Sequence, residues 1–148
     1  MNLIPLLIAG LMGCGKSGTV TGPPAAPAQW SRVSSGLPGT GYCSALTASG
    51  TTLLAGTPGF GVFRSTDGGL TWTAVTTQPT NLDIVSLAAS GTTLLAGTDA
   101  GVSRSTDGGL TWTAAMTQPT SLIVTSLTAN GTALFAGTST SGIWRYLL

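Results

Sequence analysis

The sequence predicts an all-β fold built from repeated four-stranded antiparallel sheets. Of the 148 residues, 22 are Gly, and 42% are hydrophobic, a composition typical of short strands joined by tight turns. The segment GTTLLAGT occurs at residues 50–57 and 91–98, and residues 131–138 carry a diverged third copy. The segment RSTDGGLTWT occurs at residues 64–73 and again at 104–113. A period of about forty residues is that of one β-propeller blade.

Each repeat is expected to supply the strands of one blade. The expected first strands are residues 45–48, 85–89 and 124–129, and the expected second strands are residues 52–55, 93–96 and 133–136. A Ser-Gly or Asn-Gly pair separates these two strands in every repeat, and such pairs favour the positive φ angles of a two-residue hairpin. The expected third strands are residues 61–64, 101–104 and 142–145, and the expected fourth strands are residues 71–75 and 111–116.

The third repeat shows no fourth strand of its own. The segment QWSRV at residues 29–33 is similar to TWTAV at residues 71–75, which predicts that this N-terminal strand completes the last blade and removes an unpaired edge. Propellers have about four to eight blades, so one hypothesis is a homodimer with six blades, in which each N-terminal strand finishes the neighbouring chain's last blade. The alternatives are an open three-blade stack and a fragment of a longer propeller.

The N-terminal segment predicts export and a lipid anchor. Residues 1–13 contain an apolar run of signal-peptide length, too short to span a bilayer. The run ends at Cys14 in a context that resembles a bacterial lipobox, although no Lys or Arg precedes it. Residues 14–28 then form a Pro/Gly/Ala linker, and residues 29–148 form the propeller segment. The expected location is the cell envelope, with a lipid anchor to the membrane at Cys14, or, alternatively, secretion.

The same stretch also matches a nucleotide-binding P-loop. Residues 10–17 fit the pattern G-x-x-x-x-G-K-[ST]. A P-loop requires a helix directly after it, whose N-terminus holds phosphate. Residues 17–28 contain Gly22, Pro23, Pro24 and Pro27, which exclude that helix. We therefore interpret this match as coincidental.

The charge and residue inventory excludes several kinds of chemistry. Only 6% of residues are charged and the net charge is +1, so no electrostatic footprint for nucleic acid exists. The sequence contains no Glu and no His, the latter being the commonest metal ligand and general acid/base. We expect no metal site, no catalytic residues and no cofactor. Cys43 is expected to be a buried free thiol in a strand.

The ten-residue repeat resembles the Asp-box, S-x-D-x-G-x-T-W, of sialidase-type (BNR) propellers. The matching residues are Ser65, Asp67, Gly69, Thr71 and Trp72, and Ser105, Asp107, Gly109, Thr111 and Trp112. Sialidases, sortilin-type receptors, xyloglucan-cleaving hydrolases and photosystem II assembly factors share this repeat. The resemblance implies a structural role, in which Asp holds the turn between the third and fourth strands and Trp packs beside it. The alternative is direct ligand contact by these residues.

The resemblance also bears on catalysis. A sialidase is expected to use an arginine triad, a Tyr–Glu pair and an acid/base Asp, and the chain has no Glu, so we expect it not to be an enzyme. Arg64, Arg104 and Arg145 recur once per repeat and are interpreted as repeat consensus; the alternative is a carboxylate-binding cluster. Asp83 and Asp99 could pair for glycoside hydrolysis, or simply be solvated loop residues.

The sequence favours a non-catalytic binding module as the function. The loops after the second and fourth strands of a blade open on one face. The expected ligand face carries Phe60, Asn81, Asp83, Asp99 and Ser139. These side chains suit a glycan or a protein loop. The alternatives are a degenerate, sialidase-like glycoside hydrolase that retains sugar binding, and an assembly factor for another protein complex.

Overall fold

A computed structural model describes residues 29–39, 41–115 and 123–147, and in this part of the chain all regular elements are β-strands. In chain order they are β1 (Ala45–Ser49), β2 (Thr52–Thr57), β3 (Gly61–Ser65), β4 (Thr73–Ala74), β5 (Ile84–Ser90), β6 (Thr93–Thr98), β7 (Gly101–Ser105), β8 (Thr113–Ala114), β9 (Val124–Ala129), β10 (Ala133–Thr138) and β11 (Ile143–Leu147). The described residues include no helix that is long and apolar enough to cross a membrane.

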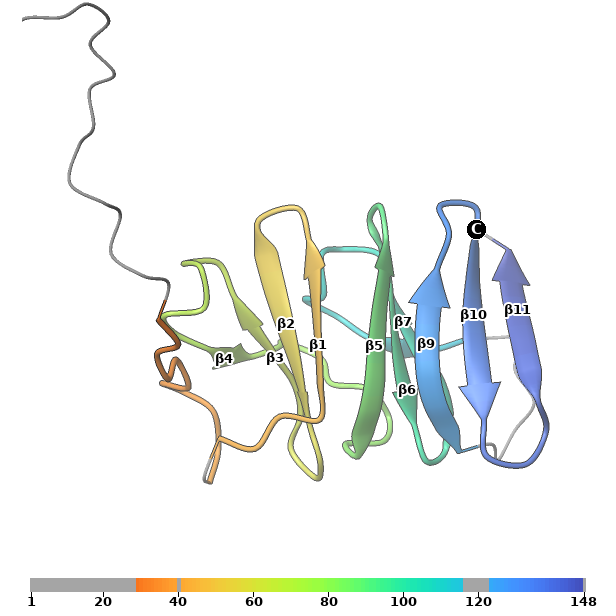
Figure 1. Ribbon diagram of the computed structural model, residues 1–148, viewed down its shortest axis with the longest axis horizontal. Coiled ribbons are helices and arrows are strands. Elements are labelled where there is room, and N and C mark those ends of the chain that lie inside the picture. The colour runs from red at the N-terminus through yellow and green to blue at the C-terminus, as the bar shows by residue number, and fades with distance from the viewer. Residues whose placement is uncertain (1–28, 40, 116–122, 148) are drawn as a thin grey trace, which may run out of the picture. The chain divides into compact units, whose positions relative to one another are not determined.

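The strands form three separate antiparallel sheets, one for each repeat (Figure 1). The first sheet has the order β1-β2-β3-β4, the second β5-β6-β7-β8, and the third β9-β10-β11. Every neighbouring pair in a sheet is also consecutive in the chain, so each sheet is a simple meander. This arrangement confirms the predicted all-β fold with blade-like four-stranded sheets.

The repeated hairpins form where the sequence predicts them. Ser49 pairs with Thr52 and Ser90 pairs with Thr93, so each hairpin has a two-residue loop. Gly50 and Gly91 begin these loops with φ angles of 60° and 57°. Only Gly adopts this left-handed conformation without a steric cost, which explains why the Ser-Gly pair recurs.

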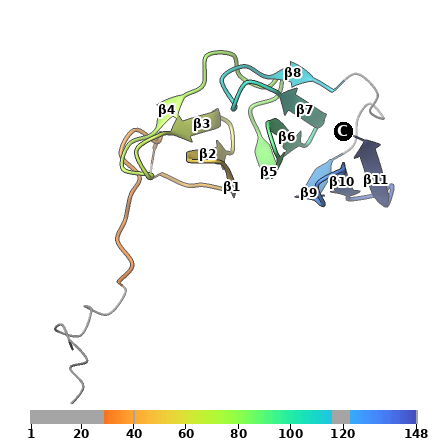
Figure 2. The same cartoon turned by 90° about the horizontal axis from the view of Figure 1, so that it is seen from above.

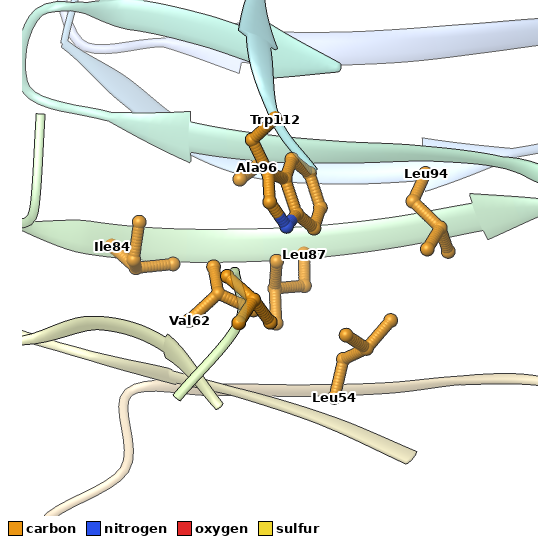
Figure 3. Packing of buried hydrophobic residues seen from close by; sticks show 8 residues of the cluster. Leu54, Val62, Ile84, Leu87, Leu94, Ala96 and Trp112 are labelled. Atoms are coloured by element: carbon orange, nitrogen blue, oxygen red, sulfur yellow. The ribbon is translucent and has the colours of Figure 1, made fainter. Parts of the chain in front are cut away.

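Each sheet packs against the next through the strands that open the repeats. β1 contacts β5, and β5 contacts β9 (Figure 2). Figure 3 shows Leu54 and Val62 of the first sheet facing Ile84, Leu87 and Leu94 of the second. Burial of each such side chain contributes about 1.5–3 kcal/mol, so the contact between sheets is the main apolar core of residues 32–148.

A glycine in the second strand of the first and of the second sheet permits this close approach. A Cβ built on Gly56 would collide with Ile84 of the next sheet, and one on Gly97 would collide with Val124. Both apolar side chains are almost completely buried. The glycine in the AGT part of the repeat therefore leaves space, here called a glycine socket, that an apolar side chain of the following repeat fills.

The outer strands are shorter than expected. Residues 71–75 and 111–116 were predicted as fourth strands, whereas β4 and β8 span two residues each. The N–H group of Trp72 donates instead to Ser35 O (2.9 Å), and that of Trp112 donates to Thr77 O (3.1 Å). At each Trp the backbone therefore does not pair with the third strand of its own sheet. It bonds the segment that precedes that sheet in the chain. Cys43 likewise lies ahead of β1, outside the strand in which it was expected.

The prediction that residues 29–33 complete the last blade requires a correction for the single chain. These residues form no strand, and the third sheet has three strands in the described part of the chain. Val33 O accepts a hydrogen bond from Trp72 Nε1 (3.0 Å), so this end of the segment is held at the first sheet.

The predicted signal peptide, Cys14 and the linker lie outside the described residues.

Candidate functional site

The first Asp-box segment forms a turn that is held by its own side chains. Asp67 Oδ1 accepts hydrogen bonds from the Ser65 hydroxyl (2.7 Å) and from the N–H group of Thr71 (3.0 Å). Asp67 Oδ2 accepts from the Thr71 hydroxyl (2.5 Å). Ser65 Oγ in turn accepts from the N–H group of Gly69 (2.9 Å). One carboxylate and one hydroxyl therefore satisfy most of the polar groups in the turn between β3 and β4.

The second segment repeats this network almost atom for atom. Asp107 Oδ1 accepts from the Ser105 hydroxyl (2.8 Å) and the N–H group of Thr111 (3.0 Å), while Oδ2 accepts from the Thr111 hydroxyl (2.6 Å). Gly109 N donates to Ser105 Oγ (3.0 Å). The two carboxylates thus occupy equivalent positions in consecutive sheets.

These hydrogen bonds stabilise the ionised carboxylates. The hydroxyl and N–H groups of Thr71, with the Ser65 hydroxyl, lower the pKa of Asp67 to about 2. The hydroxyl and N–H groups of Thr111 and the Ser105 hydroxyl lower the pKa of Asp107 to about 2 as well. A permanently ionised carboxylate with its oxygens occupied cannot act as a general acid near neutral pH.

The tryptophans that end the two segments are buried, in different ways. Trp72 packs with Ala55 and Phe63 of the first sheet. Trp112 packs against residues of both the first and the second sheet, and its Nε1 donates to Gly109 O (3.1 Å). Both indoles therefore contribute to packing, and neither is available on the surface.

A second polar cluster lies where the connection from β4 to β5 meets two hairpin loops. Asn81 Nδ2 donates to Asp99 Oδ1 (2.6 Å), and Asn81 Oδ1 accepts from the N–H group of Asp83 (2.7 Å). The Asp83 carboxylate lies beside Gly59, next to Phe60, whose side chain is 56% exposed. We name the surface formed by residues 58–60, 81–83 and 99–100 the loop face.

The loop face lies at the end of the sheets opposite the Asp-box turns. The β2–β3 and β6–β7 loops and the β4–β5 connection meet there, whereas the β1–β2 hairpin and the β3–β4 turn lie at the other end (Figure 1). The structure therefore places Asn81 beside Asp99 and Asp83 beside Gly59, and the exposed Phe60 follows Gly59 in the β2–β3 loop. Ser139 lies in the β10–β11 loop of the third sheet, and its N–H group bonds Ile123 O; no described contact joins it to the other four predicted residues.

The three repeat arginines do not converge. Each belongs to the third strand of a different sheet. Arg64 Nε donates to Gly108 O of the next sheet (3.3 Å), Arg104 Nε is buried without a partner among the described residues, and Arg145 is exposed. This placement does not form a carboxylate-binding fork, which requires convergent donors.

Among the described residues, few other side chains could act as a nucleophile or a metal ligand. Cys43 is a free thiol whose Sγ donates to Ala45 O (3.1 Å), and burial raises its pKa. Within the described residues, no three His, Cys, Asp or Glu side chains gather as metal ligands do.

Sequence reasoning missed one polar residue that organises the loop face. The Gln78 amide donates to Val62 O (2.9 Å) and accepts from Val62 N (2.7 Å). It thereby pairs with the backbone of β3 as a strand would, and it fixes the connection that carries Asn81 and Asp83. The signal that could have revealed it is the TQPT segment, which occurs at residues 77–80 and again at 117–120.

Comparison with known proteins supports the fold. A family model described as the DUF6242 beta propeller domain matches residues 13–145. No curated protein matches the chain. Three of the similar solved structures are YCF48 from Cyanidioschyzon merolae (22% identity, TM-score 0.54), a GH74 enzyme from Niastella koreensis (23%, 0.51) and the computationally designed Ika4 protein (14%, 0.52).

These alignments cover only part of the known proteins. They include 70%, 67% and 70% of this chain, but 33% of YCF48, 18% of the GH74 enzyme and 64% of Ika4. At these identities, the similarity establishes the β-propeller fold alone.

Proposed function

Because this chain belongs to the DUF6242 beta propeller domain family, we propose that it is a non-catalytic binding module of the cell envelope that binds a glycan through its loop face. The observation that carries the proposal is the cluster in which the Asn81 amide bonds the Asp99 carboxylate and the Asp83 backbone, next to the β2–β3 loop that exposes Phe60. Amide and carboxylate groups can bond sugar hydroxyls, and an exposed aromatic ring can stack on the apolar face of a sugar.

The residue inventory supports binding without turnover. The chain contains no Glu and no His, so a Tyr–Glu nucleophile pair cannot be assembled from it. Asp67 and Asp107 are engaged in their turns, which leaves Asp83 and Asp99 as the remaining acidic side chains in the sequence. Both are exposed, and no pair of buried, facing carboxylates of the kind that glycoside hydrolysis uses is found among the described residues. The Asp-box resemblance supports the same proposal, because that repeat is expected to be structural.

The proposal is tested on a glycan array with the full chain and two variants. We expect Phe60→Ala and Asn81→Ala each to weaken binding of the retained glycan by roughly tenfold, as truncation of a central contact residue does. Leu110→Ala is the matched control, because Leu110 is also an exposed apolar residue but lies at an Asp-box turn. Its binding should equal that of the unchanged chain.

Three outcomes contradict the proposal in different ways. Equal binding by Phe60→Ala and the unchanged chain removes the loop face as the site. Hydrolysis of a bound glycan shows that the module is an enzyme. An array without any retained glycan, combined with a protein partner whose binding Phe60→Ala abolishes, assigns the face to a protein ligand instead.

A further inference from the structure

The two terminal sheets expose apolar side chains whose equivalents elsewhere are buried. Ile143 of β11 is 80% exposed, whereas Val62 at the same position of β3 is fully buried. Leu46 of β1 is 67% exposed, whereas Leu87 at the same position of β5 is 8% exposed. The outer edge of the third sheet and the outer face of the first sheet are therefore both uncovered in the single chain.

The repeats show what covers the equivalent positions. β4 pairs with β3 through Phe63–Ala74 and Arg64–Thr73, and β8 pairs with β7 in the same register. Val62 is also covered by the sheet that follows it, and Leu87 by the sheet that precedes it, because both belong to the cluster between the first and second sheets. By comparison with the other sheets, β11 lacks the fourth strand that would pair with it. In the same way, β1 lacks a neighbouring sheet that would pack on its outer face.

Residues 29–33 have a sequence similar to that of a fourth strand. The residues after them make the same contacts with the first sheet that the residues after β4 make with the second sheet. Ser35 forms a parallel bridge with Thr71, as Thr77 does with Thr111. Ser35 O also accepts from Trp72 N (2.9 Å), as Thr77 O accepts from Trp112 N (3.1 Å). Because Thr77 lies three residues after the end of β4, Ser35 occupies the position three residues after the outer strand of a sheet preceding the first.

We propose that this preceding sheet is the third sheet of a second copy of the chain. In that arrangement Ser31 of one copy lies opposite Arg145 of the other, and Arg32 lies opposite Trp144, as Thr73 and Ala74 lie opposite Arg64 and Phe63. The same pairing occurs twice around a twofold axis, so all uncovered edges are used and six sheets form a closed ring. Six lies within the range of about four to eight blades that propellers adopt.

We call the contact between the third sheet of one copy and the first sheet of the other the junction. Several contacts that recur between sheets of one chain can also form there. Ile84 covers Gly56 and Val124 covers Gly97, and Cys43 is the residue at the same position before β1. It therefore covers Gly137 of the other copy, whose nearest described neighbours are otherwise only Ser126 and Thr125. Arg145 donates to the Asp-box turn of the other copy's first sheet, as Arg64 donates to Gly108 O.

Trp30 supports the same pairing. It corresponds to Trp72 and Trp112, which are 6% and 2% exposed. In the single chain Trp30 is fully exposed, which is unfavourable for so large an aromatic side chain. The pairing with β11 places its indole against the third sheet of the other copy.

Disulfide trapping between two differently marked chains tests the pairing. Both chains carry Cys14→Ser and Cys43→Ser; one adds Ser31→Cys and the other adds Arg145→Cys. Opposed residues of an antiparallel pair have Cα atoms about 4.5–5.5 Å apart, within disulfide range. Mild oxidation of the mixture should link most of the protein into a mixed dimer. Replacing the Ser31→Cys chain with a Phe60→Cys chain is the control and should give no link.

Light scattering on the full chain gives an independent measurement. We expect a mass twice the 14.7 kDa of one chain. Leu46→Asp should yield a folded monomer. Leu46 is exposed in the single chain, so a charge there weakens only the contact between the two copies. Phe60→Asp, on the loop face, should remain dimeric, which separates this inference from the proposed glycan site.

Each other result overturns the proposal. A folded monomer of the unchanged chain means that three sheets stand alone or await the remaining blades of a longer protein. Open polymers mean that the pairing does not close into a ring. A dimer without the Ser31–Arg145 link means that another surface forms the contact.

Discussion

At the residue scale, Asp67 and Asp107 show how one side chain can determine a turn. Each carboxylate accepts bonds from a hydroxyl two residues before it and from both the hydroxyl and the N–H group four residues after it. Ser and Thr are needed at those positions because only they offer short hydroxyl donors. The S-x-D-x-G-x-T spacing is thus a set of hydrogen-bond partners arranged along the chain.

Replacing Asp107 with Ala should destabilise the fold. The change leaves the N–H groups of Leu110 and Thr111 without the acceptor they use now, and charge-assisted bonds are stronger than neutral ones. We expect the Tm to fall by roughly 4 °C or more, measured by circular dichroism. Asp99→Ala is the control, since Asp99 bonds only an exposed side chain among the described residues; an equal fall in both variants would contradict the argument.

Acid should unfold the protein over a defined pH window. The pKa values of Asp67 and Asp107 are lowered from 3.8 to about 2 in the folded state. In the unfolded chain both groups bind protons more readily, so they stabilise the fold above pH 4 and this stabilisation is lost as the pH falls toward 2.

The measurement is the urea midpoint at a series of pH values between 6 and 2. The midpoint should fall mainly below pH 4, and a double Asp67→Asn, Asp107→Asn variant should show a flatter profile from a lower starting point. A parallel profile for the variant would show that other groups cause the acid sensitivity.

At the scale of elements, the sequence predicts the strands because local signals and packing agree. The first three strands of every repeat lie within two residues of their predicted ends, since Ser-Gly or Asn-Gly turns and alternating apolar residues specify them locally. The loop face was also predictable, because the alternation of strand directions places loops two and four at one end. Ser139 lies in the equivalent β10–β11 loop of the third sheet, and no described contact joins it to the other residues of the loop face.

The remaining features depend on contacts that are distant in the sequence. Trp72 N bonds Ser35 and Trp112 N bonds Thr77, which shortens β4 and β8 in a way no local pattern reveals. Gln78 pairs with the backbone of Val62 through its side chain; the recurrence of TQPT marks the residue, but not the strand 16 residues earlier that it bonds. Residues 29–33 form no strand in the described chain, because a strand-like sequence forms a β-strand only where a partner strand offers backbone groups to pair with.

The glycine sockets between sheets give a prediction at this scale. Gly97→Ala places a methyl group against Val124 and Ser86, and overpacking of this kind typically costs 1–3 kcal/mol, so we expect a loss of roughly that size. Chemical denaturation measures it. Ala114→Val, which adds volume on the exposed strand β8, is the control and should change stability little; a neutral Gly97→Ala would show that the sheets can separate slightly without cost.

At the scale of the whole molecule, stability and assembly are linked. Each sheet contacts mainly its neighbours in sequence, so repeat proteins of this kind gain stability from every additional interface. In the single chain, two interfaces join three sheets and two apolar surfaces remain in water. A second copy adds two further interfaces without adding a new kind of contact.

This linkage predicts that thermal stability depends on protein concentration. When unfolding also separates two chains, mass action raises the Tm with the concentration of protein. We therefore expect the Tm of the unchanged chain to rise steadily over a hundredfold increase in concentration, and that of Leu46→Asp to stay constant at a lower value. Differential scanning calorimetry at several concentrations measures both. A Tm of the unchanged chain that is independent of concentration would show that its three sheets unfold alone, and that the exposed side chains of β1 and β11 contribute nothing to stability in solution.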